Sequence, residues 1–134
     1  MSAVVHLGAR SYRLSQPLSL PNHITLMGEG DVSTLLFELS GPKGTDWRSH
    51  CNQSAAVEVR GANSALRDFS LVLSSPPYFP TAAVWMVENA SNFTLAGLTI
   101  TLAGANVSNA LRADGDGFEL GNTTISQPGS CECE

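Results

Sequence analysis

The chain is poor in charged residues. Only 14% of its 134 residues are charged, and Lys43 is the only lysine. This sparse charge argues against a bundle of surface-charged helices, whereas abundant Gly, Ser, Thr and Asn are typical of short strands joined by tight turns. The net charge is −5, and no basic stripe is present that could neutralise a phosphate backbone. We therefore expect no nucleic-acid partner.

Long apolar runs are also missing. No stretch approaches the roughly 20 apolar residues needed to cross a bilayer, so no membrane partner is expected. The start of the chain has neither a basic segment nor a long hydrophobic segment, which predicts that this sequence carries no export signal. Five glycosylation sequons nevertheless occur, although a chain rich in Asn, Ser and Thr produces such triplets by chance. They begin at Asn52, Asn89, Asn92, Asn106 and Asn122.

Cysteine is scarce. The chain has Cys51, Cys131 and Cys133, an odd number, and none of the paired spacings that are typical of zinc sites. Two interpretations stay open, namely free thiols or a bridge between Cys51 and one of the two tail cysteines. The three histidines lie on separate segments. We therefore expect neither a metal nor a cofactor.

An internal repeat is the most informative feature of the sequence. Residues 85–100 align without a gap with residues 110–125, an offset of 25. A third copy at residues 62–73 aligns with residues 91–102 at an offset of 29, and a fainter fourth copy begins at His23. The aligned apolar pairs of the first two copies include Phe93 with Phe118, Leu95 with Leu120, and Ile100 with Ile125.

Within each copy, apolar and polar residues alternate, a turn-forming residue interrupts the alternation, and the alternation then resumes. This pattern is typical of strands separated by bends. Two-residue hairpin turns are missing between copies, so each strand should lie parallel to its successor about 4.8 Å away. Asn63, Asn92 and Gly117 occupy the same bend, and all three residue types tolerate a left-handed backbone. The pattern predicts one all-β domain over residues 1–134, a parallel β-solenoid of about four to five coils. Loops are expected at 40–54 and 74–80.

The segment from Val4 to Leu39 resembles the first coils of right-handed parallel β-helices in the pectin-lyase-like superfamily, which includes pectate lyases and polygalacturonase-like proteins. A strand with tyrosine and leucine, a hydrophobic-Pro step and a T-L-x-G-x-G turn carry the resemblance. They correspond to Tyr12, Leu14, Pro21, Thr25, Leu26, Gly28, Gly30 and Thr34. The resemblance covers nearly the whole chain, and it is specific for the fold and poor for activity.

The resemblance implies a polysaccharide partner and an extracellular or cell-surface location. It also implies that any activity is that of a polysaccharide lyase or glycoside hydrolase. Because an export signal is missing, a piece of a longer chain is one interpretation of the sequence. The alternative function is a non-catalytic structural or interaction solenoid. In either case we expect self-association through uncapped coil ends, where strand edges are unpaired.

Two aspartates are candidate catalytic residues. Residues 114–120 resemble the N-T-D-G-(I/F)-D-(I/L) motif of polygalacturonase-like hydrolases, whose acids protonate the leaving oxygen and activate water. The resemblance implies a catalytic role for Asp114 and Asp116. The repeat favours a simple turn instead, because residues 114–117 align with residues 89–92 of the preceding copy, and Asp, Asn and Gly are ordinary turn residues.

Strand alternation predicts a substrate-binding face. With Val57, Val59, Met86 and Leu111 pointing inward, the outer face of one sheet carries Glu58, Arg60, Trp85 and Arg112. Guanidinium groups pair with uronate carboxylates and an indole stacks on a sugar ring, so this face suits an acidic polysaccharide. The alternative is a solvated sheet face with an incidental ion pair between its glutamate and one arginine.

Overall fold

The structure is a computed structural model that describes residues 3–38, 54–74, 81–103 and 107–126. Within these ranges the chain forms strands and one short 3-10 helix, η1 (Gly30–Val32), and it contains no α-helix.

The strands form three sheets. The strands of each sheet are given below in their spatial order, so that strands named next to each other are hydrogen-bonded neighbours. Sheet A contains β1 (Ala3–His6), β4 (Ile24–Met27), β7 (Ala65–Arg67), β10 (Ser91–Ala96) and β13 (Asp116–Gly121). Sheet B contains β14 (Thr124–Ser126), β11 (Thr99–Leu102), β8 (Ser70–Ser74), β5 (Thr34–Glu38) and β2 (Ser11–Leu14). Sheet C contains β12 (Val107–Ala113), β9 (Thr81–Met86), β6 (Ser54–Val59) and β3 (Leu18–Leu20).

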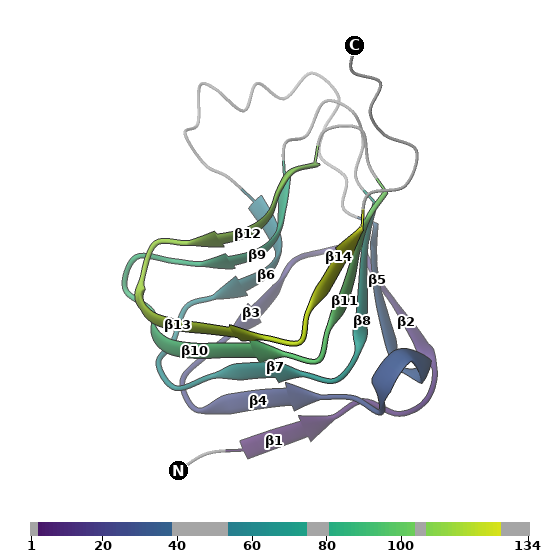
Figure 1. Cartoon of the computed structure of the whole chain (residues 1–134), viewed down its shortest axis with the longest axis horizontal. Coiled ribbons are helices and arrows are strands. Elements are labelled where there is room, and N and C mark those ends of the chain that lie inside the picture. The colour runs from purple at the N-terminus through teal and green to yellow at the C-terminus, as the bar shows by residue number, and fades with distance from the viewer. Residues whose placement is uncertain (1–2, 39–53, 75–80, 104–106, 127–134) are drawn as a thin grey trace.

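Consecutive strands belong to different sheets, and the chain returns to the same sheet with every third strand. All the strand pairs are parallel. The three sheets surround a common interior, and equivalent strands are stacked on one another (Figure 1). This arrangement is consistent with a parallel β-solenoid.

The residues that the sequence repeat aligns are the residues that pair between neighbouring strands. Phe93 pairs with Phe118 and Leu95 with Leu120 between β10 and β13, as the 25-residue offset predicts. Leu95 also pairs with Leu66 of β7, which confirms the offset of 29. The rings of Phe93 and Phe118 are stacked, with centroids 5.6 Å apart and an angle of 11° between their planes.

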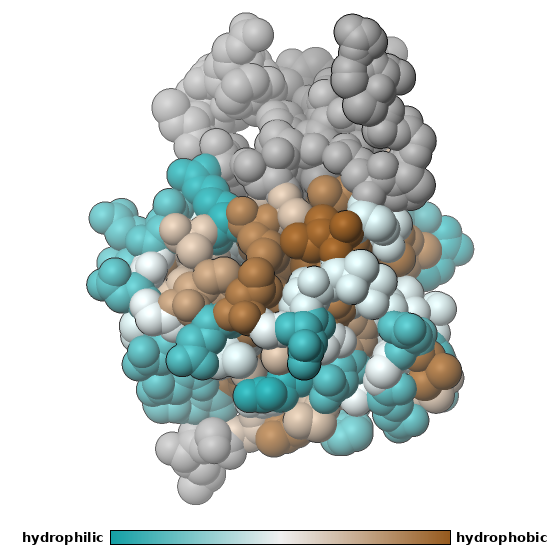
Figure 2. All heavy atoms as spheres, viewed as in Figure 1, coloured by the Kyte–Doolittle hydropathy of each residue, from teal (hydrophilic) through white to brown (hydrophobic). Residues whose placement is uncertain are grey.

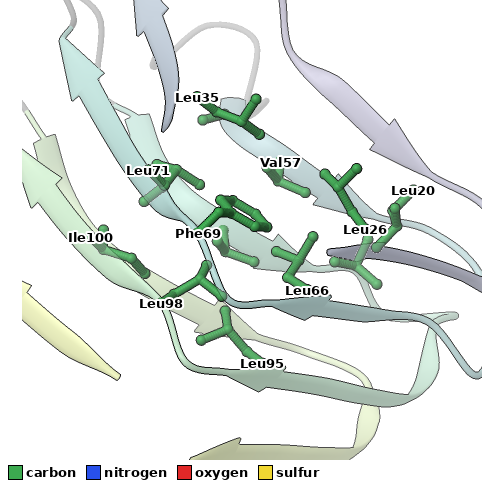
Figure 3. Close-up of a cluster of buried hydrophobic side chains, with 14 of the residues drawn as sticks. Leu20, Leu26, Leu35, Val57, Leu66, Phe69, Leu71, Leu95, Leu98 and Ile100 are labelled. Carbon is green, nitrogen blue, oxygen red and sulfur yellow. The ribbon is translucent and has the colours of Figure 1, made fainter. Parts of the chain in front are cut away.

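The interior is one apolar cluster to which all three sheets contribute. Leu66 and Leu95 come from sheet A, Leu71 and Ile100 from sheet B, and Val57 from sheet C, and all five are fully buried. Figure 3 shows these side chains converging between the sheets. Each such side chain contributes about 1.5–3 kcal/mol to folding by leaving water, so the stacked layers are the main source of stability.

The bends occur where the residue types predicted them. Asn63, Asn92 and Gly117 have φ angles of 61°, 54° and 81°, which places all three in the left-handed region. His23, the equivalent residue of the faint fourth copy, also has a positive φ of 59°. The Asn92 side-chain amide donates a 3.2 Å hydrogen bond to the Oδ1 atom of Asn63, so successive bends are linked to each other.

Most of the predicted loop residues lie outside the described part of the chain, and so do the three cysteines. The exceptions are the boundary residues Ser54 and Ser74. They belong to β6 and β8, so their assignment to the predicted loops was wrong. The pairing of Ser54 with Thr81 and of Ser74 with Glu38 extends the parallel ladders to these positions.

The layer formed by β12, β13 and β14 is less covered than the layer of β9, β10 and β11 on which it stacks. Leu120 and Ile125 are 53% and 44% exposed, although their partners Leu95 and Ile100 are fully buried. Figure 2 shows hydrophobic atoms gathered on the face that this layer presents. Self-association through such edges stays a prediction.

Amide exchange should follow this gradient of burial. We expect strong protection of the described residues between Leu66 and Leu102 and weak protection from Phe118 to Ser126, because within the described part of the chain no further strand pairs with β13 or β14 on their exposed side. Hydrogen–deuterium exchange on a dilute sample measures this directly. Equal protection of the two segments would contradict the prediction and would indicate that β13 and β14 are covered in solution.

Candidate functional site

Strand alternation places three side chains in one row on the outer face of sheet C. Glu58 of β6 pairs in register with Trp85 of β9, which pairs in turn with Arg112 of β12. Val57 and Val59, on either side of Glu58, are fully buried. The predicted division of this sheet into inward and outward residues is therefore confirmed for these positions. Three different strands bring an indole, a carboxylate and a guanidinium together.

Trp85 is held by two neighbours. Its indole Nε1 donates a 2.8 Å hydrogen bond to Oδ2 of Asp114, and Nε of Arg112 donates a 2.9 Å hydrogen bond to the same oxygen. The guanidinium carbon of Arg112 also lies 5.3 Å from the centre of the indole ring, within the range of a cation–π interaction. Asp114 thus fixes the orientation of both partners.

These contacts hold the Asp114 carboxyl in its charged form. The hydrogen bond from Trp85 is the main cause that lowers the pKa of Asp114. Desolvation, the next largest effect, raises this pKa, and the hydrogen bond and positive charge of Arg112 lower it. A carboxyl with a depressed pKa stabilises the folded state above its unfolded pKa, and that contribution is lost as the pH falls through the folded value. At neutral pH Asp114 is ionised and is a poor proton donor.

Arg60 lies immediately after β6 and is paired on the same face. Its Nη2 and Nε atoms donate hydrogen bonds of 2.6 Å and 3.1 Å to Oε1 of Glu58. The Arg60 side chain is 55% exposed, whereas that of Glu58 is only 13% exposed. The ion pair that the alternative interpretation of the sequence expected on this face is therefore present between Arg60 and Glu58. An ion pair with a solvent-exposed partner contributes less than about 1 kcal/mol to stability.

An open depression lies at the side of the row formed by Trp85 and Arg112. It has a volume of about 420 Å³ and is lined by Trp85, Glu88, Arg112 and Asp114. Glu88 was not among the site residues predicted from the sequence, because it follows the end of β9, where alternation no longer gives the direction of a side chain.

The structure separates the two candidate catalytic aspartates. Asp114 lies in the connection between β12 and β13 and lines the depression. Asp116 is the first residue of β13 in sheet A, where it pairs with Ser91, and it does not line the depression. A catalytic role for either residue stays a prediction.

Among the described residues, no three His, Cys, Asp or Glu side chains are grouped so that they could hold a metal ion. The same part of the chain contains no helix long and apolar enough to span a membrane. Comparison of the chain with protein-family models, with curated proteins and with solved structures finds no match. The proposed function therefore rests on the geometry of Glu58, Trp85 and Arg112 and of the depression beside them.

Proposed function

We propose that this chain is a right-handed, pectin-lyase-like β-helix that binds polysaccharide along the outer face of sheet C, with Trp85 at the centre of the site. The observation that supports the proposal is the cross-strand row of Glu58, Trp85 and Arg112 beside an open depression. Such a role implies an extracellular or cell-surface location.

The row has the composition that sugar recognition requires. A sugar ring presents both apolar C–H faces and hydroxyl groups, so it needs an aromatic or planar surface together with hydrogen-bonding groups. Arg112 covers part of the indole of Trp85, and the two groups line the same depression with carboxylates around them. A ligand can therefore contact planar and polar groups at one place.

Binding without catalysis fits the described residues better than hydrolysis. An acid catalyst must hold a proton near neutral pH, and the contacts of Asp114 lower its pKa. Hydrolysis by the two predicted aspartates would also require them to flank one scissile bond, and Asp116 belongs to a different sheet and does not line the depression. We accordingly expect no release of reducing ends or unsaturated products from polygalacturonate.

A Trp85→Ala variant tests the binding proposal. Removing the indole should weaken binding by about tenfold or more, since about 1.4 kcal/mol of contact energy corresponds to a factor of ten. Affinity electrophoresis against a panel of neutral, acidic and amine-bearing polysaccharides measures the effect. Thr101→Ala, on the outer face of sheet B, is the matched control and should bind like the unchanged protein.

Two outcomes would contradict the proposal. One is the absence of binding to every polysaccharide in the panel, which would favour the alternative of a structural or interaction solenoid. The other is binding that Trp85→Ala leaves unchanged, which would move the site away from sheet C. Circular dichroism of each variant establishes that it is folded.

A further inference from the structure

The charge balance of the depression points to the kind of sugar that it accepts. We propose that the site prefers glycans that carry free amino groups over neutral glycans, and neutral glycans over uronates. This inference rests on the proposed function, and it reverses the acidic preference that the arginines suggested in the sequence. Three features of the site support this preference for amino groups.

Both arginines on the outer face of sheet C, Arg60 and Arg112, already have carboxylate partners. Arg60 makes two hydrogen bonds to Glu58, the shorter of 2.6 Å, and Arg112 makes one of 2.9 Å to Asp114. A uronate carboxylate would have to displace these internal partners before it could pair with either guanidinium. The displaced carboxylates would then stay beside the bound acid, and like charges at such distances repel each other.

Glu88 adds a further negative charge to the depression. Within the part of the chain that the structure describes, no ion pair involves Glu88, and its side chain is exposed. It lines the same depression as Trp85 and Arg112. Glu88 is thus available to a ligand, and a carboxylate accepts hydrogen bonds from an ammonium group.

Among the residues that the structure describes, the charges on this face and around the depression sum to a negative value. Two arginines, Arg60 and Arg112, face three carboxylates, Glu58, Glu88 and Asp114, which leaves one unit of negative charge on the row and depression. The net charge of the whole chain, −5, has the same sign. Local and overall potentials therefore both favour a cationic ligand over an anionic one.

Three hexasaccharides with the same β-1,4 glucose-type backbone test this order. They are glucosamine hexamer, N-acetylglucosamine hexamer and cellohexaose oxidised to carboxylates at C6. Isothermal titration calorimetry at pH 6 and low salt should give the tightest binding for the amine and the weakest for the carboxylate. The preference for the amine should decrease as salt is added, because salt screens exposed charges.

A Glu88→Gln variant identifies the residue responsible. It should weaken binding of the amine hexamer by about two- to fivefold, the range for an exposed ion pair, and leave binding of the N-acetyl hexamer unchanged. Glu119→Gln is the matched control, because Glu119 is an exposed carboxylate on β13 of sheet A. The control should affect neither sugar.

The outcomes separate the inference from the proposed function. Equal or tighter binding of the carboxylate hexamer, or failure of all three hexamers to bind, would overturn the inference. An amine preference that Glu88→Gln leaves intact would overturn it as well. The proposed function survives each of these results as long as a polysaccharide of the wider panel binds in a manner that depends on Trp85.

Discussion

Replacing Leu95 by Ala should lower the free energy of unfolding by about 2–5 kcal/mol. Leu95 is fully buried and lies in the middle of a ladder in which it pairs with Leu66 on one side and Leu120 on the other. The truncation removes apolar contacts with both layers and leaves a cavity that two paired strands cannot easily close. A loss of this size is a large part of the stability of a domain of this length.

Leu120→Ala is the matched control for this variant. Leu120 is the next rung of the same ladder and has the same chemistry, but it is 53% exposed. Its truncation should cost less than about 1 kcal/mol, because little surface leaves water at this rung when the chain folds. Urea denaturation followed by circular dichroism measures both variants. Equal losses at the two positions would contradict the stacked-layer account of stability.

Replacing Gly61 by Ala should destabilise the fold by about 1–3 kcal/mol, even though the change adds only one methyl group. A Cβ atom at Gly61 would overlap the backbone nitrogen of Asn22 and would lie 2.5 Å from the carbonyl carbon of Pro21. Neither atom is the end of a flexible side chain, so the backbone itself must move. This movement would disturb the hydrogen bond of 2.7 Å from Ala62 N to the Asn22 side chain.

Gly121→Ala is the control for this effect. A Cβ atom at Gly121 would meet only the Ala96 Cβ, at 3.9 Å, which is an ordinary van der Waals distance. We expect a change within about 0.5 kcal/mol, or a slight gain because alanine restricts the unfolded chain. Thermal and urea unfolding of both variants provide the measurement. A neutral Gly61→Ala variant would mean that the layers at residues 21–22 and 61 are further apart than the structure places them.

The fold class and the register of the strands could be predicted from the sequence alone. Leu66, Leu95 and Leu120 recur at spacings of 29 and 25 residues, and a parallel stack is the arrangement that places such equivalent residues on one another. The bends at Asn63 and Asn92 could be predicted from local sequence, because few residue types adopt a left-handed backbone at low cost. These features depend on short-range patterns that repeat, so one sequence suffices to read them.

The same alternation determined which face of sheet C carries Glu58, Trp85 and Arg112. It applies only inside a strand, because successive side chains point to opposite faces only while the backbone stays extended. Alternation could not place Asp114 or Glu88 beside these residues, because the two lie beyond the ends of β12 and β9. At those positions the direction of a side chain depends on the bend and on the neighbouring layer.

The pairing of the charges in the site and the burial of each stacked residue depend on the tertiary structure and could not be predicted from the sequence. Asp114 binds Trp85 across 29 residues of sequence, a contact that no local pattern encodes. Leu95 and Leu120 occupy equivalent repeat positions, yet one is buried and the other exposed, because burial depends on the presence of a layer on each side. Periodicity gives the direction of a side chain, whereas its partners and its burial are set by chain segments that are distant in the sequence.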